Sequence, residues 1–374
     1  MSETSRTPAA SGTATQGGGA EAPVPDAVVA LEKPSRLVRL QALQILIVLA
    51  IIVAIFSALA PREFLTVFNL RGIVINTSIL AVLGVGMTFV IITGGIDLSI
   101  GSVLVFSGVV ADKVMAAMGA NSWGDAAVGA LVATLCGLAW GLFNGVVIAK
   151  AKVPPLIVTL GSLGMALGLA QVITDGIDLR DVPPMLVDTV GFGNVFGQVP
   201  TLSIIAAVVV IIGIVVLHKT KFGLHTFAIG SNPEAGRRTA INVDWHLIKI
   251  YAISGTLAGF AGILNLAFFQ STTLSGQTTA NLNVIAGVVI GGTSLFGGLG
   301  SIFGSVIGLF IPSVLQNGFV ILGVQPFWQQ VVVGAVLIVA VYVDQARRAA
   351  ALRGTQPRFL SLLARSRRES PKEK

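Results

Sequence analysis

Long apolar runs with almost no charge follow one another from residue 40 to residue 343, and they constrain the fold more than any other feature. Only 11% of the residues are charged and 54% are hydrophobic, whereas a soluble domain has about 25% charged residues. Most of the surface must therefore face lipid or other apolar helices, as in a polytopic membrane protein. The predicted spans are 40–60, 70–93, 100–118, 125–149, 155–174, 200–217, 247–269, 281–296, 300–322 and 327–343.

We expect an all-α fold of about ten transmembrane helices with both termini in the cytoplasm. Residues 1–36 lack apolar periodicity and are predicted to be a disordered tail. Residues 37–345 form the transmembrane domain, and 346–374 form a basic cytoplasmic tail. In this topology most of the 24 Lys and Arg residues fall on the cytoplasmic side, as the positive-inside rule requires. That distribution explains the net charge of +7 and argues against a nucleic-acid partner.

The loop between the sixth and seventh predicted spans carries an unusual number of charges for this chain. Ser231 and Glu234 have the spacing of a capping box, and Pro233 suits a first helical turn. We therefore expect a short helix from Glu234 to Ala240, with Asp244 capping the next span. Two interpretations remain open: a docking surface for a soluble subunit, which we favour, and an anchor at the membrane interface.

Two glycine-rich segments interrupt apolar runs in similar ways: GGIDLSIGS at 94–102 and GGTSLFGGLGS at 291–301. Either they belong to a duplicated helix–break–helix unit, as transporters often contain, or they are alike by chance. Their boundaries, near 94–100 and 297–300, are the least certain of the spans. The candidate gate or helix-break residues are Gly94, Gly95, Asp97, Ser99, Gly291, Gly292, Thr293, Gly297 and Gly298.

Asp97 is the acid that lies deepest within an apolar stretch. An ionisable residue inside a membrane is a candidate functional residue by default. At a helix break, however, a carboxylate can cap the following helix, and we favour this role over a gate. Proton coupling is the weakest alternative, because the sequence offers no evident second buried acid or histidine.

Polar and small residues within the spans have a structural and a functional interpretation. Glycines at four-residue spacing, such as Gly137 and Gly141, indicate close helix packing. The outer segment 175–199 is acidic and is either simply solvated or a docking surface for an external partner. Neutral amides could line a path for an uncharged polyhydroxylated solute or could hydrogen bond between helices. The candidate pathway residues are Asn76, Asn144, Asn265, Asn283 and Asn317.

Several signatures are absent from the sequence. No P-loop for ATP and no zinc-ligand spacing occurs. The three histidines fall in one loop with no nucleophile or paired carboxylate around them, so an enzyme acting alone is not expected. The single cysteine, Cys136, can form no intrachain disulfide.

Four stretches give the chain a family resemblance: TGGIDLSIGSVL (93–104), GLFNGVVIAKAKVPPLIVTLGSL (141–163), KFGLHTFAIGSNPEAGRRTAINV (221–243) and VIAGVVIGGTSLFGGLGSIFGSVIG (284–308). From about residue 40 to 345 the chain resembles the permease subunits of bacterial ABC importers for ribose and related monosaccharides. The resemblance implies a type II importer permease of the bacterial inner membrane.

The resemblance also implies partners. They are a second permease copy or paralogue, a cytoplasmic ATPase subunit that holds ATP and magnesium, and a periplasmic or lipid-anchored sugar-binding protein, in contact with membrane lipids. This chain itself would hold no cofactor. The coupling segment is 230–243, and its matching residues are Gly230, Asn232, Glu234, Ala235 and Arg237. Gly236 departs from the family pattern and should loosen the short helix by about 1 kcal/mol.

The sequence leaves the sugar unnamed; ribose, xylose, arabinose, galactose and polyols are all compatible. The alternative function is a secondary transporter or facilitator that works alone, which would need buried ion-coupling acids. A membrane enzyme would need a cluster of catalytic polar groups at one interface, and the sequence shows none.

Overall fold

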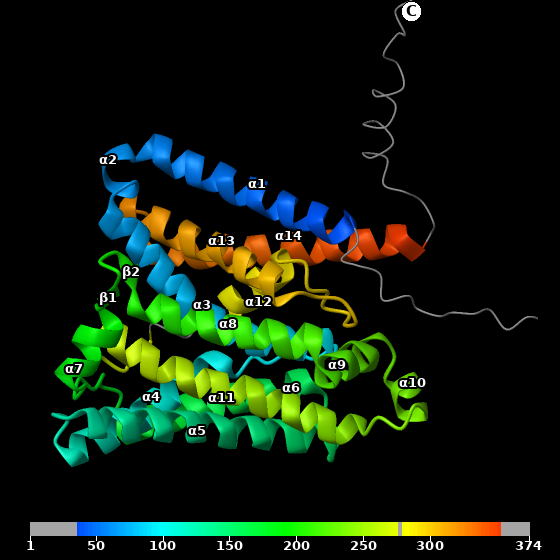
Figure 1. Cartoon of the computed structure of the whole chain (residues 1–374), viewed down its shortest axis with the longest axis horizontal. Coiled ribbons are helices and arrows are strands. Elements are labelled where there is room, and N and C mark those ends of the chain that lie inside the picture. Colours follow the sequence, from blue (N-terminus) through cyan, green and yellow to red (C-terminus); the bar gives the residue numbers. More distant parts are fainter. Residues whose placement is uncertain (1–35, 276–278, 353–374) are drawn as a thin grey trace, which may run out of the picture.

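The computed structural model describes residues 36–275 and 279–352, whose helices run roughly side by side in one bundle (Figure 1). Within these residues the fold is all-α apart from one antiparallel pair of strands, each two residues long, which confirms the predicted class. In chain order the elements are α1 (Arg36–Leu59), α2 (Pro61–Phe64), α3 (Val67–Ile92), α4 (Ile100–Met118), α5 (Trp123–Ala149), α6 (Pro155–Thr174), α7 (Pro184–Leu186), η1 (Val187–Gly191), β1 (Asn194–Val195), β2 (Val199–Pro200), α8 (Thr201–Lys219), α9 (Lys221–Ser231), α10 (Pro233–Arg238), α11 (Val243–Phe269), α12 (Ala280–Ile290), α13 (Ile302–Ile321) and α14 (Pro326–Leu352).

Each predicted span coincides with a helix. Eight of the described helices are long and apolar enough to cross a membrane, and the apolar part of α1 and the whole of α12 are shorter. A ten-span count that includes these two stays a prediction. One boundary was wrong, because the span expected over 281–296 ends at Ile290, where the second glycine-rich segment begins. Residues 1–35 and 353–374 lie outside the described residues, so both tails also stay predictions.

Helix α3 is the core of the bundle. In its most apolar window, 94% of the residues are buried. It packs against α8, α11, α12 and α13, as expected for a helix that is apolar on all its faces. The helices around it, notably α5, α6 and α8, keep large apolar side chains exposed along their outer sides. In a membrane protein such a surface faces lipid or another membrane subunit.

The predicted small-residue packing is confirmed at two helix pairs. A Cβ added at Gly137 of α5 would collide with the carbonyl oxygen of Gly255 on α11. A Cβ added at Gly304 of α13 would likewise collide with the carbonyl oxygen of Gly291, at the end of α12. Glycine at these positions lets the two backbones touch, which is how membrane helices gain packing energy.

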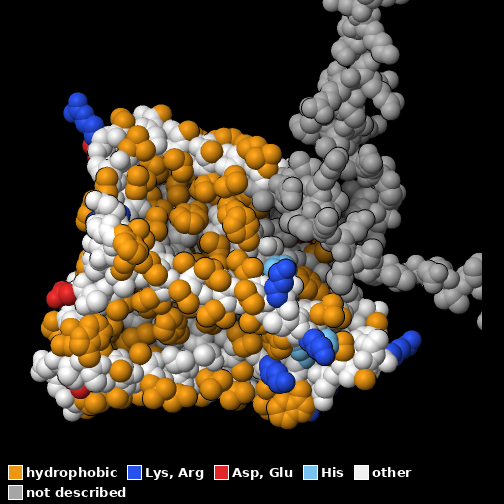
Figure 2. Space-filling view, viewed as in Figure 1, with side chains coloured by type: hydrophobic (Ala, Val, Ile, Leu, Met, Phe, Trp, Pro, Cys, Tyr) orange, Lys and Arg blue, Asp and Glu red, His pale blue; other side chains and the backbone are white. Residues whose placement is uncertain are grey.

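The two ends of the bundle differ. Helix α7, η1 and the β1–β2 hairpin gather at one end, and α9 and α10 lie at the other (Figure 1). We call these the α7 end and the α10 end. Figure 2 shows an apolar surface along the sides, with most of the visible Lys and Arg side chains toward the α10 end. This asymmetry agrees with the charge distribution from which the topology was predicted.

Candidate functional site

The first glycine-rich segment separates α3 from α4. Helix α3 ends at Ile92, and α4 begins at Ile100 after Ser99, so residues 93–99 form an irregular stretch that we call the first break. Gly94 adopts a positive φ of 77°, a conformation that glycine reaches without strain. The break lies inside the bundle, where its polar groups need partners.

Asp97 is the centre of a buried hydrogen-bond network. Its side chain is 2% exposed. One carboxylate oxygen accepts from the backbone N–H of Ser99 at 3.0 Å and from the Ser99 hydroxyl at 2.6 Å. The other accepts from the hydroxyl of Ser254, on α11, at 2.9 Å. The network continues through Asn144 on α5, which donates to Ser99 Oγ at 3.0 Å and accepts from Ser162 on α6.

This geometry corrects the expected role of Asp97. The carboxylate does not accept from the N–H groups of the first turn of α4; it holds Ser99, the residue before that turn, and reaches across to Ser254. Asp97 therefore ties the first break to α5, α6 and α11 through hydroxyl and amide groups. Satisfied buried networks of this kind fix one arrangement of the elements that they join.

The second glycine-rich segment, residues 291–301, separates α12 from α13, and we call it the second break. It has no charged residue. Thr293 Oγ1 lies 3.2 Å from Ser305 Oγ, and Thr88 on α3 donates to the same Ser305 oxygen at 2.9 Å. At its outer side Ser294 donates to Asp344 on α14 at 3.1 Å.

The coupling segment predicted at 230–243 contains the end of α9, the short helix α10 and the start of α11. The capping box expected from Ser231 and Glu234 is wrong. Ser231 is the last residue of α9, and Asn232 caps α10 by accepting from the N–H of Ala235 at 3.0 Å. As a result α10 runs from Pro233 to Arg238 rather than from Glu234 to Ala240.

The expected cap of α11 is also wrong. Asn242 caps that helix by accepting from the N–H of Trp245 at 3.1 Å. Asp244 instead forms an ion pair with Lys152, in the α5–α6 turn, at 2.7 Å, and lies 3.7 Å from Arg237. Arg237 in turn lies 3.6 Å from Glu234. These ion pairs connect α10, α11 and the α5–α6 turn at the surface of the α10 end.

The candidate pathway amides lie on five different helices, and their role in a pathway stays a prediction. Asn144 belongs to the Asp97 network. Asn265 donates to Thr273 at 2.8 Å, and Asn317 donates to Asn69 at 2.7 Å. Asn283 is buried, with a side-chain oxygen that has no hydrogen-bond partner within the described residues. Asn76 is half-buried on α3.

Sequence reasoning missed two features. Ser254 and Ser162, which complete the Asp97 network, are single hydroxyl residues in apolar helices. Only a helical-wheel projection that placed their hydroxyls on the helix faces toward the first break could have indicated them. Asp112, near the α7 end of α4, is a second buried acid with 0% exposure. Its carboxylate faces the backbone of Asp181, in the segment between α6 and α7.

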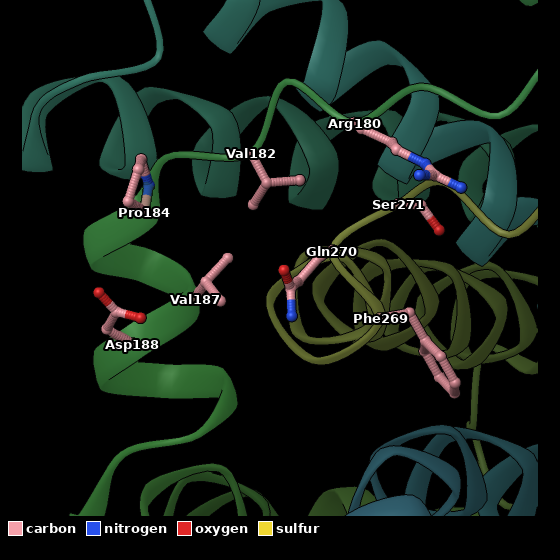
Figure 3. A pocket seen from close by; sticks show the side chains of 8 residues that line it. All are labelled: Arg180, Val182, Pro184, Val187, Asp188, Phe269, Gln270 and Ser271. Atoms are coloured by element: carbon pink, nitrogen blue, oxygen red, sulfur yellow. The ribbon is translucent and has the colours of Figure 1, made fainter.

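A pocket of about 530 Å³ opens at the α7 end, between the segment around η1 and the end of α11. Figure 3 shows Gln270 near the middle of the lining, with Arg180 and Ser271 on one side and Asp188 on the other. Phe269 supplies an aromatic wall. Its volume falls within the range of about 300–1,000 Å³ that is usual for small-molecule sites, and half of its lining residues are polar.

Comparison with known protein families places this geometry in context. Residues 69–341 match the family described as the branched-chain amino acid transport system / permease component. The ribose import permease protein of Escherichia coli (strain K12) is 38% identical over 306 residues, which are 81% of this chain and 93% of the relative. The D-allose transport system permease protein of the same strain is 36% identical over 300 residues, 80% of this chain and 90% of the relative.

The xylose transport system permease protein of Haemophilus influenzae (strain ATCC 51907 / DSM 11121 / KW20 / Rd) is 33% identical over 372 residues, 83% of this chain and 98% of the relative. No solved structure matches the chain at a significant level. The chain therefore belongs to the branched-chain amino acid transport system / permease component family. It is a transport subunit and a multi-pass protein of the bacterial inner membrane.

Proposed function

We propose that this chain is the membrane permease of an ATP-binding cassette importer that carries a ribose-like monosaccharide into the cell. A separate ATPase subunit, loaded with ATP and magnesium, drives the cycle from the cytoplasm. A periplasmic or lipid-anchored binding protein delivers the sugar, and a second permease copy or paralogue completes the path. The relatives named for ribose, allose and xylose import support the substrate class.

Helix α10 is the single observation that carries the proposal. It is short, capped and exposed, with Glu234 at 73% and Arg237 at 50% side-chain exposure. The ion pair between Arg237 and Asp244 joins it to α11. A rigid charged element at the end of an apolar bundle suits docking into a soluble partner, since such a partner recognises charge and shape.

The mechanism that we propose is alternating access. Closure of the two ATPase subunits moves α10, and the bundle responds by opening to the other side. The binding protein supplies the affinity for the sugar, so the permease path needs only weakly polar groups. The two breaks, with Gly94, Gly95, Asp97 and Ser99 in the first and Gly291, Gly292, Thr293, Gly297 and Gly298 in the second, are the candidate gate elements.

The test is uptake of radiolabelled D-ribose, D-xylose and D-allose by proteoliposomes that contain the permease with its cognate ATPase and binding protein. We expect uptake of at least one sugar that requires ATP and both partners. Arg237→Glu should abolish that uptake while the bundle stays folded, because it reverses a charge on the docking helix. Arg62→Glu, an exposed charge reversal at the other end, is the matched control.

The competing function is a secondary transporter or facilitator that works alone. It gains some support from Asp112, a second buried acid within a long apolar helix. It requires uptake by the permease alone, independent of ATP, and loss of that uptake in Asp112→Asn. Uptake of this kind would overturn the importer proposal.

The proposal also requires α10 to lie in the cytoplasm. A lone cysteine placed at the exposed Thr239, in a chain whose Cys136 is replaced by alanine, should react with a membrane-impermeant maleimide only after the cells are opened. Labelling in intact cells would place the docking helix on the wrong side of the membrane.

A further inference from the structure

The end of α9 lies at the point where the two breaks meet. The backbone N–H of Gly298, in the second break, donates at 2.8 Å to the carbonyl oxygen of Ile92, the last residue of α3 before the first break. Gly230 of α9 touches both groups: a Cβ added there would collide with Ile92 O and would lie 2.6 Å from Gly298 N. Segments more than 60 residues apart in sequence therefore share one point of contact.

The contact is made by backbone on all three sides. A Cβ added at Gly297 would lie 2.8 Å from the carbonyl oxygen of Gly230 and 3.0 Å from the N–H nitrogen of Gly94. The next residue of α9, Ser231, lies just as close to Gly298, whose added Cβ would be 2.7 Å from Ser231 Oγ. Because backbone meets backbone at Gly230 and at Gly297, a shift of α9 cannot be absorbed at these two positions by a rotamer change.

Helix α9 is also fixed to α11, the other arm of the coupling segment. Thr226 of α9 hydrogen bonds through its hydroxyl to His246 Nε2 on α11 at 2.9 Å, and both side chains are buried. The ring of Phe222 packs on the His246 ring with centroids 4.4 Å apart. Helix α10 follows α9 after one residue, Asn232. A displacement of α10 is therefore transmitted to the end of α9 with little loss of amplitude.

We propose that Gly230 is the positioning residue through which the coupling segment moves both breaks together. The proposal rests on the proposed function, in which α10 receives the motion of the ATPase. Motion enters at α10, passes along α9 and acts at Gly230 on the carbonyl end of α3 and on the second break in the same step. The two breaks then change shape as one unit.

The test compares two glycine-to-alanine changes, one in the coupling segment and one outside it. Gly230→Ala places a methyl group against two backbones, whereas an added Cβ at Gly164, an exposed residue of α6, would meet no atom within 4 Å. In the reassembled importer, measured with radiolabelled D-ribose, D-xylose and D-allose, we expect Gly230→Ala to lower the sugar transported per ATP hydrolysed by about tenfold or more. We expect Gly164→Ala to keep the wild-type ratio.

A wild-type ratio in Gly230→Ala would overturn the proposal and leave the proposed function intact. Failure of the wild-type importer to show any ATP-driven uptake would overturn both. A folding defect in Gly230→Ala does not end the test, because hydrogen–deuterium exchange on the wild-type importer gives a second measurement. We expect exchange in 93–99 and in 291–301 to change in the same nucleotide state. A change in one break alone, or in neither, would refute joint motion.

Discussion

The two glycine-rich breaks touch each other, yet they are held in different ways. The first break contains a buried carboxylate, Asp97, which accepts two hydrogen bonds from Ser99 and one from Ser254 on α11. Through Ser99 and Asn144 the network also reaches α5 and α6. The second break has neutral hydroxyl contacts at Thr293 and Ser305 and a single bond to Asp344 near the surface. Hydrogen bonds to charged groups are about twice as strong as neutral ones. We therefore expect the contacts of the first break to contribute more to the stability of the fold than those of the second, although the two breaks move together.

The strongest test of this contrast removes the charge. Asp97→Ala leaves the Ser99 N–H, the Ser99 hydroxyl and the Ser254 hydroxyl without their acceptor, at a cost of about 1–3 kcal/mol for each buried group. We expect a large fall in the thermal unfolding temperature in detergent, together with loss of uptake.

Asp97→Asn is the matched variant. Its amide oxygen can still accept from Ser99, and the Ser254 hydroxyl can rotate to accept from the new NH₂ group, so we expect a cost of only about 1 kcal/mol. Equal destabilisation by alanine and asparagine would show that the network does not hold the first break.

A second pair of variants compares the two breaks directly. Gly94 and Gly298 share a φ of 77°, so alanine at either position adds the same backbone strain, about 1–2 kcal/mol. The nearest atom to an added Cβ is 4.0 Å away at Gly94 but 2.7 Å away, at Ser231, at Gly298.

We therefore expect Gly298→Ala to lower the free energy of unfolding by about 1 kcal/mol or more beyond Gly94→Ala, because overpacking adds to the strain. Chemical denaturation in detergent measures the difference. Equal values would mean that the second break moves away from α9 at little cost, which would contradict a tight contact between Gly298 and α9.

The smallest effect is expected inside the second break. Ser305→Ala removes the hydroxyl that joins Thr293 to Thr88, at a cost of about 1 kcal/mol. Ser313→Ala on the same helix removes only a bond to its own backbone, from Ser313 to Leu309, and serves as the control. The difference in unfolding midpoint between the two variants measures how much the hydroxyl chain stabilises the break. A larger loss than in Asp97→Ala would reverse the contrast.

The helices could be predicted from sequence because apolar length is a local property. Each predicted span coincides with a helix, and the glycine spacing correctly indicated where helices touch. The caps were harder. The prediction placed the start of α10 at Ser231 because the preceding helix, α9, was not recognised, and the start of a helix depends on where its neighbour ends.

The buried network could not be predicted, because it joins residues that are distant in the sequence. Asp97 and Ser254 are 157 residues apart, and no local pattern pairs them. Asp112 was overlooked for a related reason: it precedes Lys113, and such a pair resembles the polar end of a span. Only the packing of α4 within the bundle shows that its carboxylate is buried.

The central position of α3 has a consequence for biogenesis. This helix lies early in the chain, yet α8, α11, α12 and α13, which enclose it, all follow later in the sequence. During synthesis the sides of α3 must face lipid until those helices have been inserted. In a chain truncated after α6, the sides of α3 would remain exposed to lipid. A segment that ends up enclosed by protein thus needs enough hydrophobicity to remain in the bilayer before its partners are made, and the mean hydropathy of α3, 2.1, matches the 2.0 of the more exposed helices α5 and α6.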